Sequence, residues 1–343
     1  MLLRRRFAYN PAVPFISESE SVSMHRREFL QKTTAATTAV LGALPVMAAA
    51  QQPSAPAAPA ARPLTKPTPS RTFKLKYAPH FGMFENSAGK DLIDQLKFMA
   101  DNGFTALEDN GMMGRTPELQ GQLGEAMAKL GIEMGVFVIQ TGGNNSDRFT
   151  TGKPENRDLF VKACTAAVDV AKRVNAKWMT VVPGGFERRL PIGVQHGHVI
   201  DTLRAGADVL AKQNLVMVLE PLSDNPDQFL RTSDQTYMIC RAVNSPACKI
   251  LFDMYHMQRN EGHIIPHIDY AWSEIGYFQI GDNPGRKEPT TGEVNYKNIF
   301  KHVHAKMQTD KRDFIFGMEH GNAFPGKEGE QKLIDAYVYS DAF

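Results

Sequence analysis

The sequence predicts a single (β/α)8 barrel, an α/β fold, from three observations. Short apolar runs alternate with helix-length segments whose apolar residues recur with helical period. Eight such units fit into roughly 270 residues, which is the size of one barrel of this kind. The last four runs each end on an acid or amide, at steps of 33, 26 and 40 residues, and each step has about the length of one strand, one helix and two loops.

The predicted strands are eight apolar or β-branched runs, at residues 75–79, 104–108, 132–139, 178–182, 215–220, 250–253, 277–279 and 314–319. The predicted helices lie at residues 90–102, 117–130, 157–174, 194–212, 233–243, 296–307 and 328–339. Gly103 and Gly131 directly follow the first two helices, where a left-handed cap is expected. A doubly wound open sheet is the alternative fold, but no G-x-G-x-x-G motif follows the first strand.

The N-terminal part is predicted to precede the barrel rather than to belong to it. Residues 25–32, HRREFLQK, resemble a twin-arginine export signal; a mildly apolar stretch and small residues suited to cleavage follow. We therefore assign residues 1–50 to a signal region, with Met24 as an alternative start. Residues 51–71 are rich in Pro and Ala and are expected to form a disordered linker, so that the catalytic barrel spans residues 72–343. These features predict export by the twin-arginine machinery, so that the protein is periplasmic or secreted and has no stable membrane span after cleavage. The alternatives are that the segment is an uncleaved anchor or that the Arg pair occurs by chance.

Composition favours a small-molecule partner. The chain has 39 Lys and Arg against 37 Asp and Glu, and outside the first 50 residues the numbers are 33 and 34. Because no basic stripe is present, we do not expect nucleic-acid binding. The three cysteines are too few for a disulfide framework and are expected to be core residues or free thiols. The sequence is compatible with a homo-oligomer.

The polar strand ends predict a metal site. Period two directs Glu220, Asp253 and Glu319 inward at the carboxyl ends of their strands, where a barrel gathers its functional groups. Each acid alone would fit a salt bridge or a helix cap, but at about 4 Å and an effective dielectric of about 20 each like-charge pair costs about 4 kcal/mol. No Lys or Arg occupies a matching strand end, so a bound cation is the simplest balance. With the amide oxygen of Gln279, the donor set is all oxygen and favours Mg2+ or Mn2+ over zinc.

Four motifs in the same half of the chain resemble the hydroxypyruvate isomerase family of xylose-isomerase-like TIM barrels. They are VLEP at 218–221, FDMYHMQ at 252–258, FQIGDNPGR at 278–286 and GMEHG at 317–321, and the stretch 279–296 is the most specific. Related ketose 3-epimerases typically have His where this chain has Gln279, which favours the isomerase branch. The resemblance implies metal ligation by Glu220, Asp253, Gln279 and Glu319, with Glu220 and Glu319 also exchanging protons with the substrate.

The expected reaction is the isomerisation of a small hydroxy-carbonyl acid or sugar, as in hydroxypyruvate to tartronate semialdehyde, by proton transfer through an enediolate. His256 is expected to donate to a substrate oxygen or to support a carboxylate. Arg286 is expected to bind a substrate carboxylate or to pair with nearby acids, Glu288 or Glu293. Glu108 and His80 are expected to line the pocket. The alternatives are a ketose 3-epimerase of the same barrel family and a non-catalytic periplasmic sugar-binding module. The predicted export also differs from the cytoplasmic location that the resemblance implies.

Overall fold

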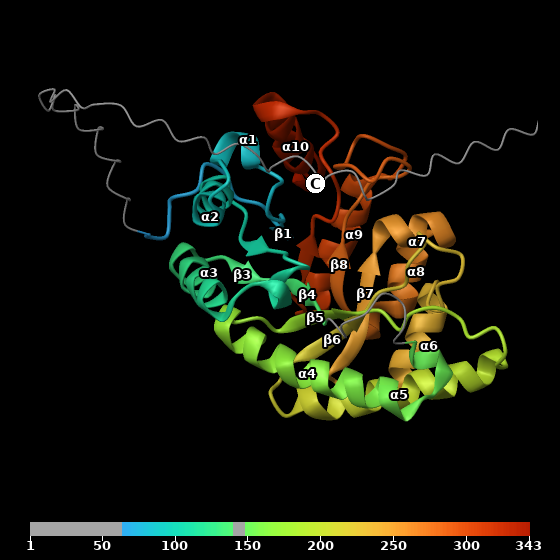
Figure 1. Ribbon diagram of the computed structural model, residues 1–343. Helices are drawn as coiled ribbons and strands as arrows, with labels where there is room; N and C mark the ends of the chain where they lie inside the picture. Colours follow the sequence, from blue (N-terminus) through green and yellow to red (C-terminus); the bar gives the residue numbers. More distant parts are fainter. Residues whose placement is uncertain (1–63, 140–147) are drawn as a thin grey trace, which may run out of the picture. The chain divides into compact units, whose positions relative to one another are not determined.

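The computed structural model describes residues 64–139 and 148–343 (Figure 1). The predicted signal region and most of the predicted linker lie outside these residues. Within the part of the linker that is described, Leu64 packs against the hydrophobic core. The backbone N–H of Ser70 donates to the carbonyl of Asp101 at 2.8 Å. The chain is therefore in contact with the barrel before the predicted start of the domain.

All eight predicted strands are present, and every strand pair is parallel. Seven strands form one sheet in the order β1-β9-β8-β7-β6-β5-β4, and β2 pairs with β3. Their bounds are β1 Lys76–Ala78, β2 Ala106–Leu107, β3 Glu133–Met134, β4 Val136–Val138, β5 Trp178–Val181, β6 Val216–Leu219, β7 Cys248–Asp253, β8 Ile275–Gln279 and β9 Ile315–Gly317.

Hydrogen bonds on both sides of β2 close the sheet into a barrel. On one side, the N–H of Glu108 donates to the carbonyl of Pro79, beyond the end of β1, at 2.9 Å. On the other side, the N–H of Gly135 donates to Leu107 at 2.7 Å. Gly135 alone separates β3 from β4, so these two form a single barrel strand and the predicted count of eight is confirmed. A side chain at Gly135 would place its Cβ 2.4 Å from the hydroxyl oxygen of Tyr277, which explains the glycine.

The helices form the outer layer, visible around the strands in Figure 1. Their bounds are α1 Glu85–Ala88, α2 Leu92–Asp101, α3 Pro117–Leu130, α4 Pro154–Val174, α5 Ile192–Ala211, α6 Ser233–Val243, α7 Met254–Asn260, α8 Ile264–Ala271, α9 Tyr296–Asp310 and α10 Gly326–Asp341. The seven predicted helices correspond to α2 to α6, α9 and α10; the bounds of α3 and α6 match the prediction, and the other ends differ by at most three residues. Gly103 and Gly131 both have the expected positive φ. The sequence analysis missed α1, α7 and α8, because four to eight residues are too few to show a helical period. Among the described residues, no helix combines the length and apolar character needed to cross a membrane.

Two separate cores confirm the predicted direction of the side chains. Small and branched residues fill the barrel interior, including Val216, Val218, Leu251 and Ile315, with Tyr277 as the largest. The alternate residues of the same strands, such as Phe316, pack outward in the larger core between sheet and helices. Residues that continue the inward series past the strand ends therefore point into the open end of the barrel.

Candidate metal centre

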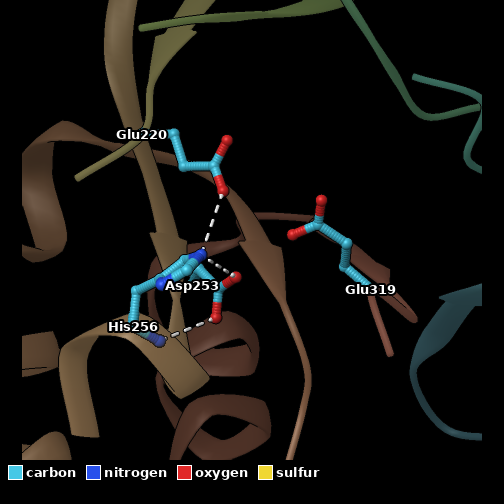
Figure 2. A group of neighbouring side chains, drawn as sticks. All are labelled: Glu220, Asp253, His256 and Glu319. Atoms are coloured by element: carbon cyan, nitrogen blue, oxygen red, sulfur yellow. Dashed lines mark hydrogen bonds and ion pairs between the residues drawn. The ribbon is translucent and has the colours of Figure 1, made fainter. Parts of the chain in front are cut away.

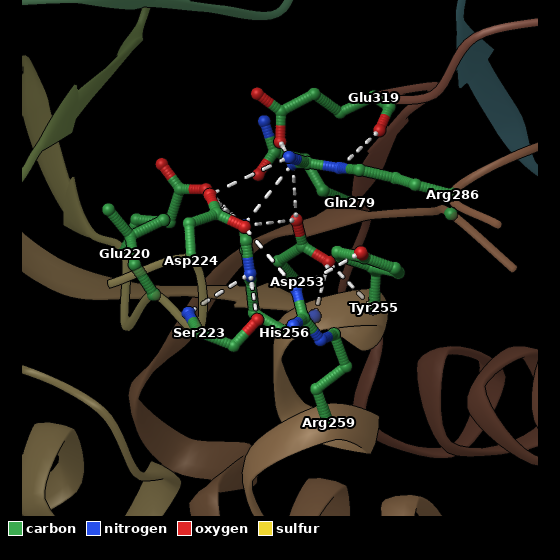
Figure 3. Close-up of polar contacts among 12 residues, drawn as sticks. Glu220, Ser223, Asp224, Asp253, Tyr255, His256, Arg259, Gln279, Arg286 and Glu319 are labelled. Atoms are coloured by element: carbon green, nitrogen blue, oxygen red, sulfur yellow. Dashed lines mark hydrogen bonds and ion pairs between the residues drawn. The ribbon is translucent and has the colours of Figure 1, made fainter. Parts of the chain in front are cut away.

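Three carboxylates and one imidazole converge at the carboxyl end of the barrel (Figure 2). One ligand atom from each of Glu220, Asp253, His256 and Glu319 lies within 4.8 Å of the others. Glu220 directly follows β6, Asp253 ends β7, and Glu319 follows β9. The strand register places Gln279 beside Asp253, and Figure 3 shows its amide among the same side chains. The four strand-end residues singled out in the sequence are thus brought together; their role as ligands remains a prediction.

The Gln279 amide offers an oxygen that the described part of the protein leaves unused. Its Nε2 donates to Glu108 Oε1 at 2.8 Å, but its Oε1 is buried and accepts no hydrogen bond from any described residue. A buried acceptor without a partner costs about 1–3 kcal/mol, so such groups normally have one. A cation held by Glu220, Asp253, Glu319 and this oxygen would supply the missing partner. The residues present therefore fit a divalent metal ion with oxygen ligands.

The electrostatics of the cluster also favour a cation. Burial raises the pKa of Glu220 well above its usual range, and the neighbouring carboxylate of Asp253 raises it further. Burial likewise raises the pKa of Glu319, with Glu220 as the next cause. Both shifts reflect negative charges gathered in a site with little water, and positive charge placed among them would lower both pKa values.

Arg286 supplies positive charge that the sequence analysis did not anticipate. Its Nη2 lies 2.7 Å from Glu319 Oε2 and 3.4 Å from Asp253 Oδ2 (Figure 3). No Lys or Arg occupies a matching strand end, as expected, but the sequence analysis did not foresee that Arg286, from the loop after β8, pairs with Glu319 and Asp253. The suggested alternative partners have other contacts: Glu288 accepts from the N–H of Ala323, and Glu293 accepts from Gln258.

His256 lies in the first turn of α7 and is fixed on one side of its ring. Asp253 is the N-cap of this helix, and its Oδ1 accepts from the N–H of Tyr255 at 2.7 Å and of His256 at 3.2 Å. The backbone N–H of Ser223 donates to His256 Nδ1 at 3.2 Å. Burial lowers the pKa of His256, which favours the neutral ring. Nε2 also lies 3.2 Å from Nη2 of Arg286, a group that can only donate. His256 Nε2 is 3.6 Å from Asp253 Oδ2 and 3.8 Å from Glu220 Oε1, and so faces the cluster.

The remaining two predicted residues lie next to the cluster and have protein partners. Glu108 is buried, and its second oxygen accepts from the Tyr277 hydroxyl at 3.0 Å. Burial raises the pKa of Glu108 to about 7, although hydrogen bonds from Gln279 and Tyr277 oppose the shift. His80 directs its two ring nitrogens at the carbonyl oxygens of Phe81 and His320, at 2.9 and 3.1 Å. The structure therefore places Glu108 behind Gln279 and uses His80 to tie the end of β1 to the segment after β9.

Sequence reasoning missed Asn110, which contacts the cluster directly. Its Nδ2 donates to Glu319 Oε1 at 3.1 Å, and its buried Oδ1 accepts no hydrogen bond from the described residues. Asn110 lies three residues beyond the end of β2, at the same edge of the barrel as the other polar groups. The pair Asp109-Asn110 directly after a predicted strand was the available signal, but the sequence analysis considered only Glu108, two residues before Asn110.

Comparison with known proteins agrees with this geometry. The family model described as xylose isomerase-like TIM barrel matches residues 96–336, more than half of the chain. The hydroxypyruvate isomerase of Escherichia coli (strain K12) is 32% identical over 150 residues, which are 43% of this chain and 58% of that protein. The 2-oxo-tetronate isomerase of Cupriavidus necator is 34% identical over 104 residues, 30% of this chain and 40% of that protein. Both relatives are named as isomerases.

Solved structures show the same fold at low sequence identity. The D-psicose 3-epimerase of Clostridium cellulolyticum H10, solved with D-tagatose, superposes with a TM-score of 0.62 at 15% identity, covering 78% of this chain and 96% of that one. At this identity the likeness concerns the fold alone. Together with the family match over most of the barrel, it shows that the chain belongs to the xylose isomerase-like TIM barrel family.

Proposed function

We propose that this protein is a metal-dependent isomerase that converts a small hydroxy-carbonyl acid, of the hydroxypyruvate type, into its aldehyde isomer. The observation that carries the proposal is the placement of Glu220 and Glu319 on either side of Asp253, from strands β6 and β9 (Figure 2). Two carboxylates that reach one substrate from different sides can remove a proton from one carbon and return it to the next. The similarity to relatives named hydroxypyruvate isomerase supports the same reaction class.

The proposed isomerisation moves one proton between two carbons and one proton between two oxygens. One of the two glutamates removes a proton from the hydroxymethyl carbon, and the electron pair forms the double bond of an enediolate. Return of a proton to the former carbonyl carbon, with loss of the proton from the hydroxyl on the terminal carbon, leaves an aldehyde at that carbon. His256, whose Nε2 faces the cluster, would pass a proton to the former carbonyl oxygen, and the proton released by the terminal hydroxyl would restore it. A divalent ion held by Glu220, Asp253, Gln279 and Glu319, for which we propose Mg2+ or Mn2+, supplies positive charge that stabilises the negative oxygen as it forms.

The raised pKa values support the acid and base roles. A carboxylate with an ordinary pKa is a weak base at neutral pH, and metal coordination weakens it further. Without a bound ion, burial and neighbouring charge raise the pKa values of Glu220 and Glu319, which opposes the lowering that a cation would cause. A pKa nearer to the working pH is what general acid and base catalysis requires.

Two guanidinium groups favour an acid over a neutral sugar as substrate. Arg286 and Arg259 lie over the ring of Tyr255, with guanidinium carbons 4.9 and 5.4 Å from its centroid. Both approach the carboxylate of Asp224, at 3.9 and 3.5 Å, and the Asp224 side chain is 52% exposed. In the structure the carboxylate between the two arginines is that of Asp224, and we propose that a substrate carboxylate binds in its place.

Hydrogen exchange during turnover tests the proposal. Hydroxypyruvate is incubated with the protein and Mn2+ in deuterated water, and proton NMR follows both the aldehyde product and deuterium at the carbons that change. We expect product and deuterium incorporation with Mn2+ and neither after chelation. Glu319→Gln is expected to abolish both, whereas Glu293→Gln, an exposed carboxylate in the loop after β8, is expected to leave them unchanged. Full turnover by Glu319→Gln with metal bound would refute the role of Glu319.

The same opposed pair of carboxylates is compatible with a ketose 3-epimerase, in which the proton leaves and returns at one carbon. A parallel assay with common ketoses distinguishes the two, because an epimerase yields a stereoisomer and no aldehyde. A non-catalytic sugar-binding module would bind without any exchange. From the twin-arginine-like motif we further propose that the protein is exported and acts in the periplasm or outside the cell.

A further inference from the structure

Glu108 is a buried glutamate in the barrel that the proposed chemistry does not use. The residue is 2% exposed and directly follows β2. One oxygen accepts from the amide nitrogen of Gln279 at 2.8 Å, and the other accepts from the hydroxyl of Tyr277 at 3.0 Å. Burying a carboxylate is costly unless it is hydrogen bonded, and in this position it gains only two donors. An apolar residue would fill the space at a lower free-energy cost, so the presence of a carboxylate indicates a specific role.

We propose that Glu108 is a positioning residue that fixes the orientation of the Gln279 amide, so that Oε1 rather than the NH2 group faces the metal. The inference rests on the proposed function, because it requires an ion at Gln279. A carboxylate accepts hydrogen bonds and cannot donate them, so it holds the NH2 end of the amide against itself. The opposite orientation would place two oxygens in contact and turn the NH2 group, which cannot ligate a cation, toward the other ligands.

The unpartnered oxygen of Gln279 is the second observation that supports this role. Oε1 is buried and receives no hydrogen bond from the described residues, although a half turn of the amide would exchange it with the satisfied NH2 group. Glu108 explains why that half turn does not occur. It also explains how an uncharged ligand is kept ready for a cation among three carboxylates.

The surrounding backbone is shaped to admit the Glu108 carboxylate. A Cβ at Gly317, on β9, would lie 1.8 Å from Glu108 Oε2. A Cβ at Gly135 would lie 2.4 Å from the Tyr277 hydroxyl that donates to the same carboxylate. Two strands therefore have glycine where a side chain would displace Glu108 or Tyr277. Glu108 is also absent from the group whose ligand atoms lie within 4.8 Å of one another, so it supports a ligand rather than acting as one.

The test is Mn2+ affinity, measured by isothermal titration calorimetry at pH 8 on the whole protein. Glu108→Gln keeps the size of the side chain but adds an NH2 group that competes for Gln279 Oε1. We expect the Kd for Mn2+ to rise about 10- to 100-fold, the usual effect of losing a contact that orients a metal ligand. Glu330→Gln is the matched control. Glu330 is equally buried, but it accepts from Asn86 and Ser87 of α1, and this variant is expected to bind Mn2+ like the wild type.

A second background separates orientation from general damage. In Gln279→Glu, the ligand offers an oxygen in either orientation and a carboxylate behind it is no longer needed. Glu108→Gln introduced into that background is therefore expected not to weaken Mn2+ binding, and its amide can donate to the new carboxylate. A residue with a merely structural role would weaken binding by the same factor in both backgrounds.

The outcomes are distinct. Equal Mn2+ affinity of wild type and Glu108→Gln would overturn the inference alone, as would the same loss in both backgrounds. A wild-type protein that binds no Mn2+ would overturn the proposed function together with the inference. Thermal unfolding of each variant shows whether it is folded. If Glu108→Gln does not fold, Glu108→Asp takes its place. Because the shorter carboxylate does not reach Gln279 Nε2, we expect the Kd for Mn2+ to rise at least tenfold. An unchanged Kd would overturn the inference.

Discussion

The substitution Gly317→Ala is expected to destabilise the metal-free protein strongly. Gly317 ends β9, and its position inside the barrel faces Glu108. A Cβ at this position would lie 1.8 Å from Glu108 Oε2, 2.9 Å from its carboxyl carbon and 3.1 Å from Cγ of Gln279. No real Cβ tolerates the first two distances, and the barrel interior leaves little room for movement. The carboxylate must therefore move away from its two donors, Tyr277 and Gln279.

The expected loss follows from those contacts. Hydrogen bonds to a charged group contribute about 1.5–3 kcal/mol each, so breaking both costs roughly 3–6 kcal/mol of unfolding free energy. Urea unfolding followed by circular dichroism measures the change. Gly121→Ala is the control, because Gly121 lies within α3 and nothing lies within 4 Å of its added Cβ. That variant is expected to gain roughly 0.5–1 kcal/mol from the higher helix propensity of Ala. If Gly317→Ala unfolds at the same urea concentration as the wild type, the packing account of the Glu108 site is refuted.

Three further predictions follow from other parts of the structure. Asp253→Asn keeps an oxygen that caps α7 but loses the charge of a proposed ligand. We therefore expect weaker Mn2+ binding in calorimetry, with an unfolding free energy within about 1 kcal/mol of that of the wild type. A large loss of stability would contradict this expectation. Arg259→Met is expected to raise KM for hydroxypyruvate about three- to fivefold in steady-state assays with little change in kcat, since the side chain is partly exposed; an unchanged KM would argue against a carboxylate contact. All three cysteines are buried and free, and burial raises the pKa of Cys164 to about 12. A thiol reagent at pH 8 should therefore label no cysteine in the native protein and three cysteines after unfolding. Labelling of a single cysteine after unfolding would instead indicate a disulfide.

Much of the fold could be predicted because its signals are local. The run at 314–319 predicts both a strand and the direction of its side chains, and Ile315 and Phe316 do face the inner and outer cores. The 14 residues of α3 carry their own period, with Thr116 and Gly131 at the ends, and its bounds match the prediction. Short helices have no such signal. α7 forms because Asp253 caps it, and the cap is visible only once the strand end is known.

The site could be predicted as far as it depends on strand ends. The alternation of side chains along each strand and the spacing between strand ends identified four residues that meet at the open end of the barrel: Glu220, Asp253, Gln279 and Glu319. Contacts made by loops could not be read in this way. Arg286 reaches Glu319 because its loop turns back, with the N–H of Arg286 donating to the carbonyl of Asp282 at 2.7 Å. Such a turn depends on contacts between residues whose side chains show no repeating pattern.

The most direct test of the central claim is a crystal structure of the protein with Mn2+, measured at a wavelength where manganese scatters anomalously. The ion is identified by its own anomalous signal, independently of any measurement of activity. The structure predicts one strong anomalous peak at the open end of the barrel, in contact with oxygens of Glu220, Asp253, Gln279 and Glu319. An absence of any peak there, or a peak that the Gln279 oxygen does not touch, would contradict it.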